Sequence, residues 1–436
     1  MSIQSALSQL LILIGMSTQV TIAFADASIS SEVETELALG QADSDLQKVD
    51  VAIKFDIGGN LANDIRYTFI PRLLMAIDSE LYIDDPDERN YSKGNGPLWA
   101  NRHGLIEISE AYVDFEAWKG YWRLGKQQVV WGQADGLKVL DVVNPQDLRE
   151  FNLDDVEDSR IPLWMLNAEF DVTGDSSLQW VLIPDATYSN LADPGTPYFM
   201  TSSKYRPDAN SAPFPVVVNK AVRPDTALDV GARYRLFLAG WDLTFNYLRH
   251  YQDVPVIYRR LRAGKLEVSP VYERNHLLGA TASNAFGDWV VRMEVGYSTD
   301  TYQLRSDLQN DGIANTPEVS SVVGLDYRGF SDWFLSYQWF QSKLLDYDGY
   351  IVRNRQRMQH TLLLRRFLLN ETLELELFSL YSDEDQDGQV RAKVSYLISD
   401  ELRAWFGIDT FYGDIDGQFG QFNNTDRFVL GVAMSF

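Results

Sequence analysis

The chain ends in the stretch RFVLGVAMSF, residues 427–436, and this stretch decides the fold. Large apolar side chains occupy every second position from Phe428 to Phe436, and smaller residues stand between them. Side chains of a β-strand point alternately to opposite faces, so this pattern predicts a strand with one strongly apolar face.

The same alternation recurs through most of the chain. It runs, for example, from Trp241 to Tyr247 and from Trp333 to Trp339. No segment shows a long apolar stripe at helical spacing, and parallel sheets need crossover helices, so antiparallel strands are expected. About 18 strands are predicted, near residues 29–40, 46–58, 65–84, 105–118, 121–131, 161–172, 177–185, 225–238, 241–254, 271–285, 289–303, 318–328, 332–343, 356–368, 372–382, 389–398, 402–412 and 427–436. The first of these is the weakest, and 16 strands is the alternative.

The composition excludes several classes of protein. The 436 residues include no cysteine, which excludes a disulfide scaffold, a cysteine metal site and a thiol enzyme. Lys and Arg total 38 against 62 Asp and Glu, and this net charge of −24 argues against nucleic acid as a partner. A mean hydropathy of −0.22 is too low for a bundle of membrane helices. It does fit strands whose second face is polar.

Connections between the predicted strands alternate in length. Short turns such as 239–240 and 369–370 alternate with longer loops such as 187–222 and 255–270. Outer-membrane barrels have short periplasmic turns and long external loops, and their closure leaves no strand edge in the lipid. We therefore predict an all-β fold, a transmembrane antiparallel up-and-down β-barrel in the bacterial outer membrane.

Three further expectations follow from a barrel in that membrane. The strand that ends at Phe436 resembles the C-terminal signature read by the outer-membrane assembly machinery. Aromatic residues at the short-turn ends, among them Trp118, Trp289 and Trp333, fit an interfacial girdle. Outer-membrane lipid and lipopolysaccharide are the expected surroundings.

The N-terminal residues fit a secretory signal peptide. The apolar run from Leu10 to Met16 is too short to span a membrane, and Ala23-Phe24-Ala25 forms a small-x-small cleavage site. No Lys or Arg precedes Lys48, so the usual positive region is missing. We predict a signal peptide at residues 1–25 and a single barrel domain at residues 26–436.

The polar positions of the strands are predicted to line the lumen. Charges of both signs occur there, and they either line a water-filled path or pair across strands. The candidates on strands are Glu110, Asp114, Glu116, Arg123, Lys126, Gln127, Arg233, Arg235, Arg292 and Arg365.

The loop at residues 132–160 is unusually apolar for a solvated loop, yet it carries interspersed charges. It either folds into the lumen as a constriction or packs on other external loops. The candidate constriction residues in and beside it are Trp131, Asp141, Asn144, Asp147, Arg149, Glu150 and Arg160.

Arg123 and Lys126 have opposite parity on one predicted strand. A regular strand would send one of them into lipid, at a cost of about 2–4 kcal/mol at the midplane. We therefore predict a β-bulge at Gly125 that turns both side chains inward. Replacing Gly125 by Val is expected to impair assembly.

No catalytic chemistry is indicated by the sequence. It contains no G-x-S-x-G or phosphate-binding loop, and its four histidines form no ligand pair. Asp383, Asp385 and Asp387 match the first half of a calcium loop, but Val394 stands where the required Glu belongs. We expect neither an enzyme nor a cofactor, and weak divalent binding at these three aspartates is the one metal candidate.

The segment WRLGKQQVVWGQADGLKVLDVVNPQDLREF, residues 122–151, resembles a Gram-negative outer-membrane family catalogued only as a domain of unknown function. The family run is R-x-G-[RK]-Q, then V-x-W-G, then D-V-x-N-P-x-D, and every piece is present here. The strand motif is also similar, more distantly, to alginate-export barrels. The resemblance implies a porin-like barrel and an association with transporters of the resistance–nodulation–division type.

Two functions follow as expectations. The first is a porin-like channel for small solutes, with hydrophobic and anionic solutes as the candidates. The alternative is a barrel without an open pore that serves as the outer-membrane partner of a periplasmic or inner-membrane export system. The current through planar bilayers separates them.

Overall fold

The computed structural model describes residues 27–41, 46–62, 64–81, 90–206, 214–224 and 227–436. The predicted signal peptide lies outside these residues. No helix in the described ranges is long and apolar enough to cross a membrane.

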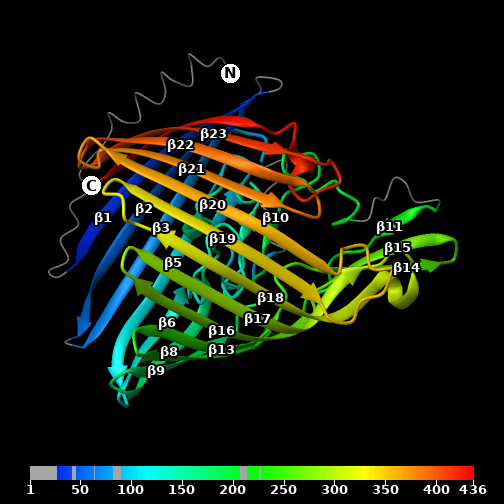
Figure 1. The fold of residues 1–436 in the computed structure, drawn as a ribbon, viewed down its shortest axis with the longest axis horizontal. Helices are drawn as coiled ribbons and strands as arrows, with labels where there is room; N and C mark the ends of the chain where they lie inside the picture. Colours follow the sequence, from blue (N-terminus) through cyan, green and yellow to red (C-terminus); the bar gives the residue numbers. More distant parts are fainter. Residues whose placement is uncertain (1–26, 42–45, 63, 82–89, 207–213, 225–226) are drawn as a thin grey trace.

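Strands of the described chain form one closed antiparallel barrel, tilted against its long axis (Figure 1). Its 18 members are β1 (Ser28–Gly40), β2 (Leu46–Ala62), β3 (Ile65–Ser79), β5 (Gly104–Ala117), β6 (Gly120–Gln127), β8 (Leu163–Thr173), β9 (Ser176–Ile183), β12 (Asp229–Leu238), β13 (Trp241–Tyr251), β16 (Arg274–Phe286), β17 (Trp289–Leu304), β18 (Ile313–Tyr327), β19 (Trp333–Leu344), β20 (Gln356–Leu368), β21 (Leu373–Ser382), β22 (Asp387–Ser399), β23 (Leu402–Tyr412) and β24 (Arg427–Ser435). Each pairs with the next in this order, and β1 closes the ring against β24 from Glu32↔Ser435 to Gly40↔Arg427. The prediction of 18 antiparallel strands is confirmed, and the alternative of 16 is wrong.

Shorter elements lie in the connections on the long-loop side. They are β4 (Trp99–Asn101), β7 (Asp147–Leu148), β10 (Asn190–Leu191), β11 (Val216–Val218), β14 (Val256–Arg262), β15 (Lys265–Val271), α2 (Val156–Ser159), η2 (Gln309–Gly312) and η3 (Gly420–Phe422). The hairpin β14–β15 projects beyond the barrel together with β11 (Figure 1). The sequence analysis predicts a longer loop at residues 255–270, and the structure has an antiparallel hairpin there.

The outer face of the barrel is apolar. Phe245, Leu278 and Leu430 are exposed there, at alternate positions to the inward-facing side chains of the same strands. At the short-turn ends Trp118 and Trp289 are exposed, as an interfacial girdle requires. An apolar band closed on itself fits only a bilayer, and this barrel is an outer-membrane barrel.

The predicted bulge at Gly125 is wrong. β6 pairs in unbroken register with β5, from Ala117↔Gly120 to Ala111↔Lys126, and with β8, from Gly120↔Phe170 to Gln127↔Leu163. The irregularity lies instead on β5, where Ile70 of β3 pairs with Glu110 and Pro71 pairs with Ile108, so that Ser109 is passed over.

Regular alternation therefore sends Lys126 away from the lumen, on the same face as its register partner Trp164. Its ammonium is buried and donates to the carbonyl oxygen of Asn95 at 3.3 Å. Segment 90–98 covers this part of the outer face, so the lysine avoids lipid without turning inward.

Candidate functional site

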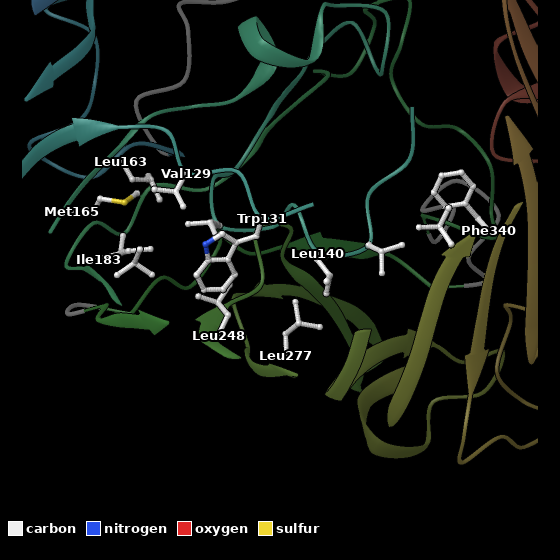
Figure 2. Close-up of a cluster of buried hydrophobic side chains, with 13 residues drawn as sticks. Val129, Trp131, Leu140, Leu163, Met165, Ile183, Leu248, Leu277 and Phe340 are labelled. Atoms are coloured by element: carbon white, nitrogen blue, oxygen red, sulfur yellow. The ribbon is translucent and has the colours of Figure 1, made fainter. Parts of the chain in front are cut away.

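The loop at residues 132–160 lies inside the barrel. Trp131, Val139 and Leu140 belong to one buried cluster with inward-facing apolar residues of six strands. Figure 2 shows Trp131 and Leu140 among these partners. These partners are Leu163, Met165, Val181, Ile183, Leu248, Leu277, Val322 and Phe340. Trp131 is 2% exposed, and its indole nitrogen donates to Gln179 Oε1 at 3.0 Å. The apolar residues of this loop thus fill one side of the lumen.

Asn144 ties the two ends of this inserted loop together. Its Oδ1 accepts from the backbone nitrogen of Val129 at 2.8 Å, and its Nδ2 donates to the carbonyl oxygen of Ile161 at 3.0 Å and to that of Gln127 at 3.3 Å. Asn144 is buried, so its three hydrogen bonds lie in a water-poor setting, where losing one would leave a polar group without a partner. The same amide group therefore fixes both the entry and the exit of the loop.

An ion pair reinforces this closure. Arg160 donates to Asp141 Oδ2 through Nε at 3.0 Å and through Nη2 at 2.8 Å. Lys138 lies 3.2 Å from the same oxygen. Burial is the larger cause and lowers the pKa of Lys138, while Asp141 acts in the opposite direction.

The far end of the inserted loop is held by Glu150. Its carboxylate accepts from Lys48 Nζ at 2.5 Å and from Arg427 Nη1 at 2.7 Å. Burial raises the pKa of Glu150, but the two cations outweigh it and the pKa falls to about 2. Lys48 lies on β2 and Arg427 on β24, so Glu150 links the loop to the strands beside the β1–β24 closure.

Asp154 follows in the same loop, 3.8 Å from Lys48 Nζ. Burial and then the negative charge of Glu150 raise its pKa to about 8. This carboxyl group is therefore neutral at mildly acidic pH and charged at alkaline pH.

Phe151 anchors the loop next to Glu150. Its backbone has a φ of 59°, a conformation that L-residues rarely adopt. Its ring centroid lies 4.9 Å from that of Phe422 and 5.6 Å from that of Phe419, both in the loop between β23 and β24. External and inserted loops thus share one aromatic cluster.

The other side of the inserted loop borders a polar cavity. The opposite wall of this cavity comes from β1, β2, β3, β5 and β21–β24. Its carboxylates are Glu34, Glu36, Asp50, Glu107, Asp147, Glu150, Asp154, Asp155, Asp158, Glu376 and Asp409. Its cationic side chains are Lys48, Arg72, Arg149, Arg391, Lys393, Arg403 and Arg427. Eleven acids against seven bases leave the lining net acidic.

The remaining predicted lumen residues are mostly paired within the wall. Arg123 donates to Asp114 at 2.7 and 3.1 Å, Arg235 to Asp242 at 3.0 and 2.5 Å, and Arg365 to Glu376 at 2.7 Å. Two others hold the start of the inserted loop: Arg233 donates to the carbonyl of Val130 at 3.1 Å, and Arg292 to Asp135 at 2.7 Å. Asp147 and Arg149 pair with each other on the cavity wall.

Glu110 and Glu116 lie apart from this cavity. Glu116 is exposed near the short-turn end of β5, in register with Tyr121. Glu110 lies on β5 directly after Ser109, the residue that the register between β3 and β5 skips.

The sequence prediction missed Glu34, Glu36, Lys48, Asp50 and Arg427. Alternation on their strands would have placed these residues on the polar face, since Glu32, Glu34 and Glu36 alternate with Val33 and Thr35. Their meeting with Glu150 depends on the closure of β1 against β24, which no single strand pattern reveals.

The three aspartates of the metal candidate do not share a site. Asp383 accepts from His360, Asp385 accepts from Lys204 at 2.9 Å and Tyr205 at 2.8 Å, and Asp387 accepts from the backbone nitrogens of Phe419 and Gly420. Within the described ranges no group of three or more His, Cys, Asp or Glu is arranged to hold a metal ion.

Solved structures show the same fold. OccAB3 of Acinetobacter baumannii is similar with a TM-score of 0.54 and 11% identity, over 95% of this chain and 100% of that chain. OccK5 (OpdH) of Pseudomonas aeruginosa gives 0.52 and 11%, over 94% and 98%. OccK2 (OpdF) of the same organism, in complex with glucuronate, gives 0.52 and 10%, over 94% and 97%. These neighbours are outer-membrane porins and not enzymes.

Two sequence comparisons add to this. Yapsin-5 of Saccharomyces cerevisiae is 32% identical over 81 residues, a local match to 17% of this chain that spans only about half, 49%, of that protein's length. The family model described as "Protein of unknown function (DUF1302)" matches residues 21–412, most of the chain. The chain therefore belongs to the DUF1302 family, as its residues 122–151 predict.

Proposed function

We propose that this protein is a porin-like channel whose narrow passage runs between the inserted loop and the polar wall of β1–β3 and β21–β24. The observation that carries the proposal is the division of the lumen. The apolar side of the loop is packed onto one half of the wall, and charged side chains line the cavity on the other half. A loop that filled the lumen completely would leave no charged cavity beside it.

The net acidic lining supports a preference for cations over anions. In a low-dielectric pore, fixed carboxylates lower the energy of a permeating cation and raise that of an anion. The paired cations of the wall reduce this preference without reversing it, because the carboxyl groups outnumber the cationic side chains eleven to seven. Asp154, whose pKa is raised to about 8, adds its negative charge only at alkaline pH. Small hydrophilic cations are therefore the proposed solutes, in place of the hydrophobic or anionic solutes suggested by the sequence.

The test is the current through single molecules in planar bilayers, measured in a gradient of KCl. The wild type is expected to give a stable ohmic current with a reversal potential of the cation-selective sign. Replacing residues 135–155 by a short Gly/Ser linker should raise the conductance several-fold. Removing residues 257–270 of the external β14–β15 hairpin is the matched control, and it should leave the conductance unchanged.

Two results would contradict the proposal. A reversal potential of the opposite sign would favour anions, the class to which the glucuronate bound to OccK2 belongs. The absence of current from both the wild type and the loop replacement would favour a barrel without a pore of its own, acting as the partner of an export system.

A further inference from the structure

The barrel wall is interrupted beside β5. The ladder between β5 and β6 ends at Ala111↔Lys126, and the short ladder between β5 and β4 begins at Trp99↔Ile106. Between these two ladders, residues 107–110 have no strand partner on this side in the described part of the chain. At about 3.3 Å per residue, four residues make an opening about 13 Å long, which we call the wall gap.

Segment 90–98 lies across the wall gap, with Tyr91 at the lumen cavity and Gly94 beside the outward-facing Trp164. The Asn95 side chain donates to the carbonyl oxygen of Pro162 at 2.9 Å and to Thr187 Oγ1 at 3.0 Å. Trp164 donates from its indole nitrogen to the carbonyl oxygen of Gly94 at 2.7 Å. These side-chain hydrogen bonds hold the middle of the segment, and backbone hydrogen bonds hold its two ends, from Leu98 N to the carbonyl oxygen of Ile106 at 2.8 Å and from Tyr188 N to that of Asn90 at 2.8 Å. They stand where the continuous ladder runs elsewhere in the wall.

The covering segment is lightly packed. A Cβ built on Gly94 would meet nothing within 4 Å, and one on Gly96 would meet only Tyr91 Cβ at 3.6 Å. By contrast, a Cβ on Gly279 of the wall would lie 2.4 Å from Leu140. Displacing the part of the segment around these two glycines thus costs few close contacts, and the main loss is the hydrogen bonds of the segment, among them those of the buried Asn95.

The inner side of the wall gap is continuous with the lumen. Tyr91, Leu105 and Glu107 all line the polar cavity beside the inserted loop. Tyr91 belongs to the covering segment itself, and Glu107 lies on the unpaired edge of β5. Movement of the segment would therefore open this cavity sideways.

The outer side of the wall gap is apolar. Leu98 is 70% exposed, Trp99 48% and Ile106 40%, and Trp164 beside them is 37% exposed. Exposed aromatic and aliphatic side chains around one opening offer a surface for an apolar molecule that moves between protein and lipid.

From these observations we propose that the wall gap is a lateral exit, through which a small apolar molecule passes between the lumen and the outer leaflet when segment 90–98 moves aside. The proposal goes beyond the ionic channel above. It shares with that channel only the requirement that the lumen be accessible from the periplasm.

Locking segment 90–98 to the loop that follows β9 tests this exit. The Ser92 backbone nitrogen donates to Thr187 Oγ1 at 3.0 Å, so the two residues are neighbours, and Ser92→Cys with Thr187→Cys introduces one cysteine pair there in a chain that has no other cysteine. Migration on a non-reducing gel checks that the disulfide has formed. Intact Gram-negative cells expressing the variant are given N-phenyl-1-naphthylamine, whose fluorescence rises in the apolar phase. We expect the oxidised variant to take up the probe at least threefold more slowly than the same variant after reduction.

A second cysteine pair provides the control. Thr173 Oγ1 lies 2.7 Å from Ser176 Oγ at a short turn, so Thr173→Cys with Ser176→Cys forms a lock that restrains no covering segment. Oxidation of this pair should leave uptake unchanged. A third variant, Asn95→Ala, loosens the segment and should accelerate uptake.

The result that overturns the lateral exit is equal uptake by the oxidised and reduced forms of the Ser92/Thr187 pair. Planar-bilayer conductance of both forms separates the two proposals, because the exit predicts the same ionic current in each. An absent current in both forms, with uptake still sensitive to the lock, would refute the ionic channel and leave the exit standing.

Discussion

Glu150 is the side chain through which the inserted loop holds the wall at its far end. Replacing it by Gln leaves Lys48 and Arg427 buried with one carboxylate fewer, although Glu36 at 3.1 Å and Asp409 at 2.8 Å remain as partners. Breaking a buried ion pair from one side costs about 3–5 kcal/mol, and the remaining partners favour the lower end. We expect the free energy of unfolding in urea, measured in lipid vesicles, to fall by about 3 kcal/mol.

The matched control for this change is Glu157→Gln in the same loop, where the side chain is exposed. It removes the same charge and should change the unfolding free energy by less than about 0.5 kcal/mol. Equal losses in the two variants would mean that the net charge of the loop matters and the ion pairs do not.

Asp154 gives the cavity a dependence on pH. Since burial and Glu150 raise its pKa to about 8, this carboxyl group is protonated and neutral at pH 6 and carries a negative charge at pH 9. A carboxylate's charge appears as the pH rises through its pKa, so cation selectivity should increase between these two values. The reversal potential in a KCl gradient measures the change.

Asp154→Asn should reduce this increase while keeping the shape of the side chain. A variant whose selectivity rises between pH 6 and pH 9 as much as that of the wild type would assign the effect to other groups. Glu150 is not a candidate for it, because its pKa of about 2 keeps it charged throughout.

At the scale of the element, β6 depends on the glycine at position 125. Gly125 has a φ of 142°, and a Cβ there would lie 2.1 Å from the Ala111 carbonyl oxygen and 2.6 Å from Tyr112 Cα of the neighbouring strand. Backbone atoms of β5 cannot move aside as a flexible side chain could. We therefore still expect Gly125→Val to impair assembly. The cause is the close contact between β5 and β6 at this position and not a bulge.

Heat modifiability on unboiled gels measures assembly in this case. Gly125→Val should lose most of the fast-migrating folded band, whereas Gly174→Val, at a turn where a Cβ meets nothing within 4 Å, should keep it. A full folded band from Gly125→Val would show that β5 and β6 can separate without losing the barrel.

At the scale of the whole molecule, the sequence predicts the strands well because lipid and lumen impose opposite demands on alternate residues. Boundaries are less certain where a strand runs into a polar loop. The strand predicted at 225–238 begins at Asp229, and the one predicted at 65–84 ends at Ser79. Alternation indicates the face on which each residue lies, but it does not indicate the residue at which the strand begins or ends.

The lumen is harder to predict from sequence because its contacts join distant strands. Glu150, Lys48 and Arg427 meet only because the barrel closes and because the loop turns inward. The place where the register between β3 and β5 shifts also depends on both strands together, so the sequence of one strand cannot predict it. The parity of Arg123 and Lys126 indicates that something unusual occurs near β6, yet the passed-over residue is Ser109 on β5 and the cover over Lys126 comes from segment 90–98.

The assignment of the two faces has a direct energetic test on one strand. Val394 of β22 is exposed on the apolar face, and the next residue, Ser395, faces inward in register with Glu374. An arginine at position 394 must enter lipid, which costs about 2–4 kcal/mol near the midplane and less toward the interface. An arginine at position 395 enters the polar lumen beside a carboxylate.

We therefore expect Val394→Arg to lower the unfolding free energy in lipid vesicles by about 2–4 kcal/mol, and Ser395→Arg to lower it by less than about 1 kcal/mol. The two variants carry the same new side chain at neighbouring positions of one strand, so the change in net charge and the strand propensity of the new residue are the same in both. A larger loss from Ser395→Arg than from Val394→Arg would mean that the faces are assigned the wrong way round, and equal losses would mean that the two faces do not meet different surroundings.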